Sequence, residues 1–89
     1  MNNTFTFHSD AGHGWLEVSA TELADVGASA KDFSRYSYRK KFLYFLEEDC
    51  DAPKFIGLFN AKYGTKPTIN EYHHDGDFIE DNNLNSIHS

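Results

Sequence analysis

Residues 8–13 carry the side chains of this chain that are best suited to chemistry. The stretch reads His-Ser-Asp-Ala-Gly-His, so two imidazoles, a carboxylate and a hydroxyl fall close together. Imidazole and carboxylate are ligands of zinc and manganese, and a turn could bring His8, Asp10 and His13 onto one ion. Polar turns collect the same residue types to bond their own backbone. We therefore expect no metal and no cofactor, and keep a metal-dependent hydrolase as a second alternative.

The same turn offers Ser9 as a nucleophile, His13 as its base and Asp10 as the orienting group. A catalytic triad needs each group held by a rigid element, together with donors for the oxyanion. Three residues of one small turn do not meet that need, so we predict no catalytic residue and favour a protein that is not an enzyme. Gly12 and Gly14 could cradle an anion, although glycine also serves simply to reach positive φ in a turn.

Two alternating segments must position this turn, and together they predict a hairpin over residues 4–19. A register with His8 opposite Trp15 sorts both strands at once, because side chains alternate between the faces of a sheet. One side then holds Phe5, Phe7, Leu16 and Val18. The other side holds Thr4, Thr6, His8, Trp15, Glu17 and Ser19. Trp15 is either core, covered by a helix or by the tail, or an exposed anchor for a binding partner.

Two charged clusters offer further surfaces. The basic cluster is interleaved with tyrosines and consists of Arg35, Tyr36, Tyr38, Arg39, Lys40 and Lys41. Arginines hold phosphates and tyrosines stack on bases, so this cluster predicts a nucleic-acid site as an alternative function. The acidic run consists of Glu47, Glu48, Asp49 and Asp51. A helix N-terminus explains part of this run, and a docking surface for a basic protein explains the rest.

Composition limits the class of protein. The chain has 89 residues and a net charge of −6, all of it contributed by residues 47–89. Such acidity disfavours general affinity for nucleic acids. The single cysteine, Cys50, favours a reducing compartment, and we find neither a signal-peptide pattern nor an apolar run of membrane-spanning length. We expect a cytoplasmic protein, either monomer or homodimer, that does not enter membranes.

Capping signals place two helices. Ser19-Ala-Thr-Glu22 forms a capping box that opens a helix over about 20–26, and Asp51-Ala-Pro53 opens a second helix over about 52–63 with Asp51 as N-cap. Residues 34–46 predict a strand pair without a tight two-residue turn, because the connection lacks Gly, Asn and Asp. Residues 68–73 predict an edge strand that could support homodimerisation.

The expected fold is α+β, with a small, mainly antiparallel sheet of four or five strands and the two helices packed on it. Residues 1–74 form this domain, and residues 75–89 form an acidic, partly flexible tail.

Three segments together resemble a group of small, uncharacterised proteins of bacteriophages and plasmids. The segments are His8-Ser-Asp-Ala-Gly-His-Gly-Trp-Leu-Glu-Val18, Ser34-Arg-Tyr-Ser-Tyr38 and Leu46-Glu-Glu-Asp-Cys-Asp-Ala52. The resemblance implies an accessory protein of a mobile genetic element in a bacterial cytoplasm. It brings no activity and no catalytic residue.

The leading hypothesis is a non-enzymatic accessory protein that binds a host or phage protein, for example as an inhibitor of a defence complex. The surface expected to bind that protein consists of His8, Asp10, His13, Trp15, Glu17, Glu47, Glu48 and Asp49.

Overall fold

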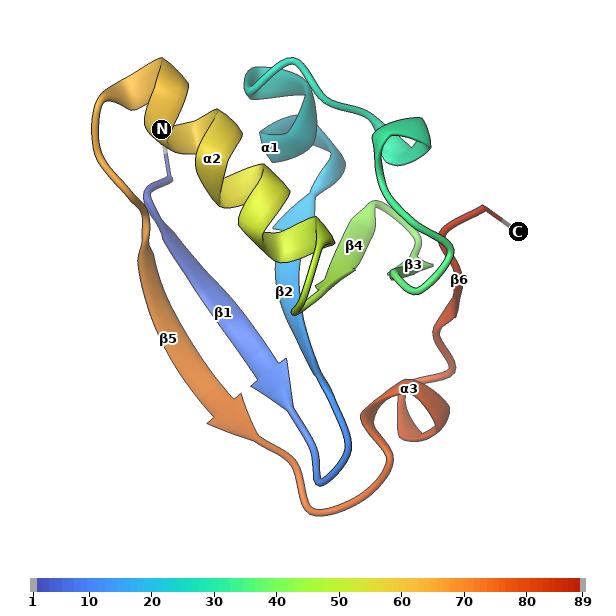
Figure 1. Ribbon diagram of the computed structural model, residues 1–89. Helices are drawn as coiled ribbons and strands as arrows, with labels where there is room; N and C mark the ends of the chain where they lie inside the picture. Colours follow the sequence, from blue (N-terminus) through green and yellow to red (C-terminus); the bar gives the residue numbers. More distant parts are fainter. Residues whose placement is uncertain (1, 89) are drawn as a thin grey trace.

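The computed structural model describes residues 2–88 and confirms the α+β class. Met1 and Ser89, the ends of the two predicted ranges, lie outside the described residues. One six-stranded sheet has the order β5-β1-β2-β4-β3-β6, and all of its neighbours are antiparallel except β1 and β5 (Figure 1). Its strands are β1 (Thr4–Ser9), β2 (Gly14–Ser19), β3 (Tyr38–Lys40), β4 (Leu43–Glu47), β5 (Thr68–His73) and β6 (Asn85–Ser86). The sheet has more strands than the four or five predicted.

The N-terminal hairpin has the predicted register, with His8 opposite Trp15 and Phe7 opposite Leu16. Helices α1 (Ala20–Asp25) and α2 (Asp51–Tyr63) cover one face of the sheet. The main core lies between them and the sheet and includes Phe5, Leu16, Val18, Leu23, Leu46, Phe55 and Phe59. The Phe5 ring meets the rings of Phe55 and Phe59 edge-on at 5.2 and 5.8 Å, a favourable aromatic geometry. The alternation of apolar and polar residues along β1 and β2 therefore places the apolar side chains on the face of the sheet that α2 covers.

The caps of the first two helices differ in how well they were predicted. Ser19 and Glu22 form the predicted capping box of α1. Asp51 is not the N-cap of α2, because Cys50 occupies that position. The Asp51 carboxylate turns inward instead and accepts hydrogen bonds from the backbone N–H and hydroxyl of Ser34 and from the buried Ser37 hydroxyl. A buried carboxylate needs such donors, so Asp51 ties the loop before β3 to the start of α2.

The β3–β4 hairpin corrects two expectations. The strand begins only at Tyr38, because residues 34–37 form a turn. Lys40 pairs with Leu43, so the connection is a tight two-residue turn at Lys41 and Phe42. Lys41 adopts a φ of 57°, the left-handed region that glycine or asparagine usually occupies. The missing turn formers therefore indicated a strained turn, not a longer loop.

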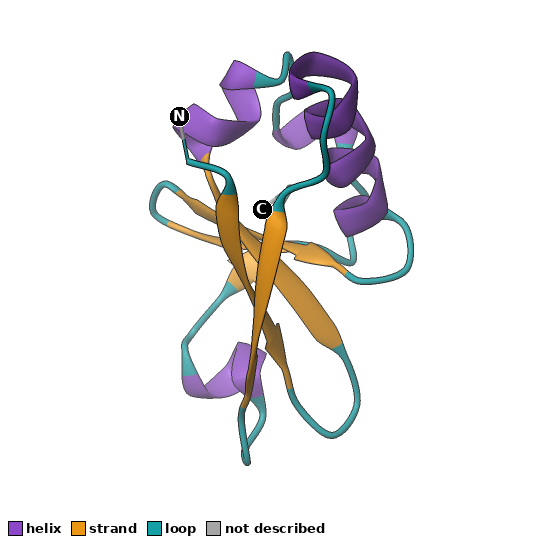
Figure 2. Ribbon diagram, turned by 90° about the vertical axis from the view of Figure 1, so that its left-hand side faces the viewer, coloured by secondary structure: helices purple, strands orange, loops and turns teal. Residues whose placement is uncertain are grey.

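The second face of the sheet has its own smaller core, made by Trp15, Phe45, Phe78 and Leu84. Phe78 comes from the short helix α3 (Phe78–Asp81), which lies apart from α1 and α2 (Figure 2). The chain then pairs with β3 through β6 and inserts Ile87 into the main core. Residues 78–87, which fall in the range expected to form a partly flexible tail, therefore contact both cores.

Among the helices within residues 2–88, α2 is the longest, and it packs on the sheet. No helix within residues 2–88 has the length and apolarity needed to cross a bilayer.

Candidate functional site

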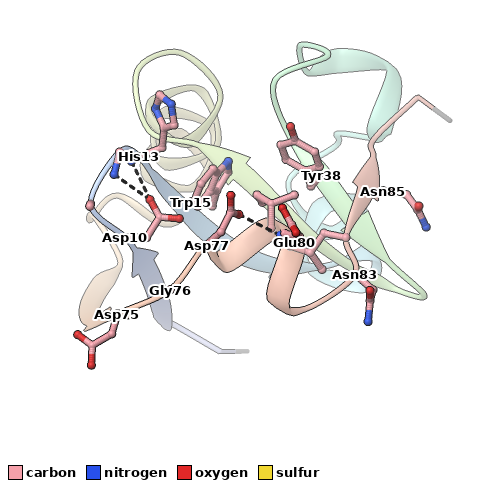
Figure 3. Close-up of a pocket in the computed structure, with 14 residues that line it drawn as sticks. Asp10, His13, Trp15, Tyr38, Asp75, Gly76, Asp77, Glu80, Asn83 and Asn85 are labelled. Carbon is pink, nitrogen blue, oxygen red and sulfur yellow. Dashed lines mark hydrogen bonds between the residues drawn. The ribbon is translucent and has the colours of Figure 1, made fainter.

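Two pockets adjoin on the α3 side of the molecule, with volumes of about 950 and 360 Å³. They share His13, Trp15 and Tyr38, which lie in a row across the larger pocket (Figure 3). The Trp15 ring is 6.0 Å from the His13 ring and 6.3 Å from the Tyr38 ring, edge-on to both. An aromatic row therefore forms the common floor of both pockets.

Carboxylates border this aromatic floor on two sides. Glu48 and Asp49 line the smaller pocket, beside Tyr36. Asp75, Asp77 and Glu80 line the larger one. Within residues 2–88, neither pocket is lined by a lysine or an arginine. We name this combined region the acidic surface, and define it by His13, Tyr36, Tyr38, Glu48, Asp49, Asp75, Asp77 and Glu80.

Trp15 is not an exposed anchor, because its side chain is only 5% exposed. Phe78 stacks on it with ring centroids 5.7 Å apart. The alternative in which the C-terminal segment covers Trp15 as core is the correct one. Trp15 is therefore part of the floor of the pockets and not an exposed contact residue. Among its neighbours, His13 is exposed.

Asp10 holds the predicted turn and α3 together. One carboxylate oxygen accepts the backbone N–H groups of Gly12 and His13, each at 3.0 Å. The other accepts the N–H of Phe78, also at 3.0 Å. The hydrogen bond from the Phe78 N–H is the largest cause and lowers the pKa of Asp10. Burial, the next largest, raises it, and the N–H groups of His13 and Gly12 lower it further, so the net shift is downward. Asp10 was predicted as a docking residue, and its observed contacts give it a structural role instead.

His8 and Glu17 bond to each other instead of facing a partner. His8 Nε2 lies 2.8 Å from Glu17 Oε1, and His8 Nδ1 lies 2.9 Å from His74 Nε2. The His8 ring also stacks on Phe78 at 4.6 Å. In the contact between the two imidazoles one nitrogen must donate and the other accept, so the chain Glu17–His8–His74 fixes both rings beneath α3.

The residues proposed for metal or nucleophilic chemistry are not brought together. His8 bonds to Glu17, Asp10 bonds to backbone, and His13 is exposed. Ser9 Oγ lies 3.2 Å from His73 Nδ1 and 3.4 Å from Glu71 Oε2, so its side-chain neighbours are on β5. Across the described part of the chain, no group of three histidine, cysteine or carboxylate side chains is arranged to hold a metal ion. Of these residues, Asp10 follows the ordinary pattern of backbone bonding in a turn, and His8 and Ser9 bond to side chains of neighbouring strands.

The acidic run divides into structural and free carboxylates. Glu47 accepts the backbone N–H groups of Asp49, Cys50 and Asp51, and so serves the start of α2. Burial raises the pKa of Glu47, but these three donors outweigh it and the net shift is downward. Glu48 and Asp49 are exposed at the smaller pocket. Of the predicted acidic docking residues, these two remain available to a partner.

The basic cluster does not form one platform. Tyr38 faces Trp15, whereas Arg39, the next residue of β3, points to the opposite side of the sheet. Arg35 lies over the neighbouring Tyr36 ring, and Lys40 Nζ donates to the carbonyl of Asn82 beside α3. Lys41 stands at the hairpin turn. The nucleic-acid alternative therefore has its residues dispersed over two faces.

Part of the acidic surface was missed because it comes from the supposed tail. Asp75, Asp77 and Glu80 line the larger pocket together with Asn83 and Asn85. A signal was present, since Asp77 and Glu80 have the spacing of an N-cap and its third helical residue just before and after Phe78-Ile79. Asp77 indeed accepts the backbone N–H of Glu80. This pattern would have predicted α3.

Comparison with protein-family models, curated proteins and solved structures finds no match for this chain.

Proposed function

We propose that the protein is a non-enzymatic binding protein whose acidic surface takes a basic, arginine- or lysine-rich segment of another protein. The observation that supports this most is the meeting of two pockets over the floor of His13, Trp15 and Tyr38, with carboxylates on both sides. Guanidinium groups pair with carboxylates and stack on aromatic faces, so one arginine can use the carboxylates together with the exposed His13 ring, while the buried Trp15 supports that ring from below.

The charge distribution supports a cationic partner. The net charge is −6, and the carboxylates of the acidic surface are not neutralised by a lysine or arginine lining either pocket within residues 2–88. A field of one sign at a concave surface raises the local concentration of ligands of the opposite sign. The resemblance to phage and plasmid proteins would make the partner a host or phage protein, and an inhibitor of a defence complex is one such role.

Titration with a fluorescently labelled arginine-rich peptide, followed by anisotropy, tests the proposal. An acidic peptide of equal length is the negative control. Glu48→Gln combined with Asp49→Asn should weaken binding about two- to thirtyfold, because two exposed ion pairs contribute about 0.4–2 kcal/mol together. Binding should also weaken as salt rises.

The matched control raises the net charge equally on the far side of the molecule. Asn60→Lys combined with Ala61→Lys changes two exposed positions of α2 and should leave peptide affinity within about twofold if the site is local. Equal loss of affinity in both double variants would show that only net charge matters, and no binding of the basic peptide at low salt would refute the function.

No observation favours the nucleic-acid or hydrolase alternatives over this one. The residues that each would use lie apart, as described above. Glu17, His8 and His74 form a hydrogen-bonded chain of a carboxylate and two imidazoles. Phe78 of α3 covers this chain.

A further inference from the structure

The edge of the sheet formed by β5 is unusual in its length and exposure. All six residues from Thr68 to His73 are exposed, and Tyr72 is 61% exposed. Within residues 2–88, β5 has β1 as its single strand neighbour. The opposite edge, β6, has two residues only. Natural sheets usually protect a long edge with charged side chains, above all lysine, or with proline or a bulge; residues 68–73 contain neither lysine nor proline, and Glu71 is their one acidic side chain.

The hydrogen-bond pattern identifies which backbone groups face outward from β5. Thr68 donates to the carbonyl of Asn3, and His74 donates to the carbonyl of Ser9. In a parallel pair alternate residues bond to the same neighbour, so Asn70 and Tyr72 also face β1. The N–H and C=O groups of residues 69, 71 and 73 consequently point away from β1, toward the open side.

We propose that this edge pairs with the β5 edge of a second copy, antiparallel and about a twofold axis at Tyr72. Three symmetric registers would align two or more of the outward residues 69, 71 and 73 with those of the second copy, whereas an axis at Ile69 or His73 would align only one. An axis at Glu71 sets two carboxylates face to face, which is repulsive. An axis at Asn70 sets Pro67 opposite His73, where proline lacks the N–H that the ladder needs.

The register centred on Tyr72 has neither fault. Glu71 of each copy lies opposite His73 of the other, so a carboxylate meets an imidazole twice by symmetry. The imidazole can donate a hydrogen bond to the carboxylate whether or not it is protonated. On the other face of the sheet Tyr72 lies opposite its own symmetry mate, and aromatic cross-strand pairs are favourable. Because the contact is isologous, it closes with two copies and does not propagate into a fibre.

The expected dimer is weak, since one strand edge buries less area than a permanent interface needs. Sedimentation velocity of the full chain from about 10 µM to about 1 mM should show a concentration-dependent shift from monomer to dimer. Hydrogen exchange provides the specific readout. The amides of residues 70 and 72 should be protected at every concentration, and those of residues 69, 71 and 73 should gain protection only as the dimer forms.

Charge exchange tests the register. Glu71→Lys sets lysine opposite His73 and should weaken the dimer about two- to thirtyfold, because two complementary pairs are lost. Adding His73→Glu to that variant restores opposite charges and should return the affinity to within about threefold of the original. Thermal melts of both variants check that each monomer stays folded.

Three results would overturn the proposal. They are a monomer at every concentration, a dimer that Glu71→Lys leaves unchanged, and a double variant that does not recover. Glu71 and His73 are not members of the acidic surface, so this test and the peptide titration change different residues and fail independently.

Discussion

Replacing Phe78 with alanine removes the side chain that covers the second face of the sheet. Phe78 is 3% exposed, stacks on His8 at 4.6 Å and on Trp15 at 5.7 Å, and meets Phe45 edge-on at 5.5 Å. It is the buried residue of α3, a four-residue helix that has little stability of its own. We expect Phe78→Ala to release α3 from the sheet.

The magnitude follows from these contacts. Burying a phenylalanine side chain contributes about 1.5–3 kcal/mol, and each aromatic pair adds about 0.5–1.5 kcal/mol. Large-to-small changes of this kind cost about 3–5 kcal/mol in total. At about 4–8 °C per kcal/mol for a domain of this size, the melting temperature should fall by at least about 12 °C.

Fluorescence provides the assay, because Trp15 is the single tryptophan of the chain. In the variant its emission should shift to longer wavelength, and acrylamide should quench it more strongly. Phe42→Ala is the matched control, since Phe42 is 65% exposed at the hairpin turn and the same atoms are deleted. The control should change stability by less than about 0.5 kcal/mol and leave the emission unaltered.

A variant with unchanged Trp15 emission and a melting temperature within a few degrees of the original would refute this reasoning. Such a result would mean that α3 does not cover the Trp15 indole, and that the floor of the pockets does not depend on Phe78.

Two further predictions test the polar anchor and the turn. Because the folded pKa of Asp10 is depressed, its contribution to stability is present above the unfolded pKa of about 3.9 and is lost as the pH falls through the lower folded value. Asp10→Asn should lower stability at neutral pH and flatten this acid-dependent loss in urea titrations, and superimposable pH profiles would contradict that. Lys41→Gly should raise stability by about 0.5–1 kcal/mol, because glycine relieves a φ of 57° at a modest entropic cost. A lower melting temperature in the glycine variant would show that the turn is not strained.

Local patterns predicted the parts of the fold that depend on neighbours in the sequence. The register of His8 and Trp15 follows from alternation in two adjacent segments, and the Ser19–Glu22 box follows from a four-residue motif. The helix expected over 52–63 begins one residue earlier, at Asp51. In these cases the information lies within a few residues of where it acts.

Non-local contacts account for what could not be predicted. Asp10 bonds to Phe78 across 68 positions, and β5 pairs with β1 in parallel after the whole of α2. Trp15 is covered by Phe78 and Leu84, which come from a distant segment with few apolar residues. That segment gives no strong sequence signal for packing against Trp15. The acidic surface was only half visible for the same reason, since one side of it arrives with α3.

The chain from Phe78 to Ile87 places aromatic and aliphatic groups in both cores, passing around the outer edge of β3 between them. This segment couples the stability of the two faces. If Ile87 leaves the main core, Phe78 is held less firmly in the second core, and the reverse is also true. The layers should therefore open as a single cooperative unit, and amides on β2 and β4 should exchange at one shared rate under conditions of global opening, with neither face surviving as a stable fragment.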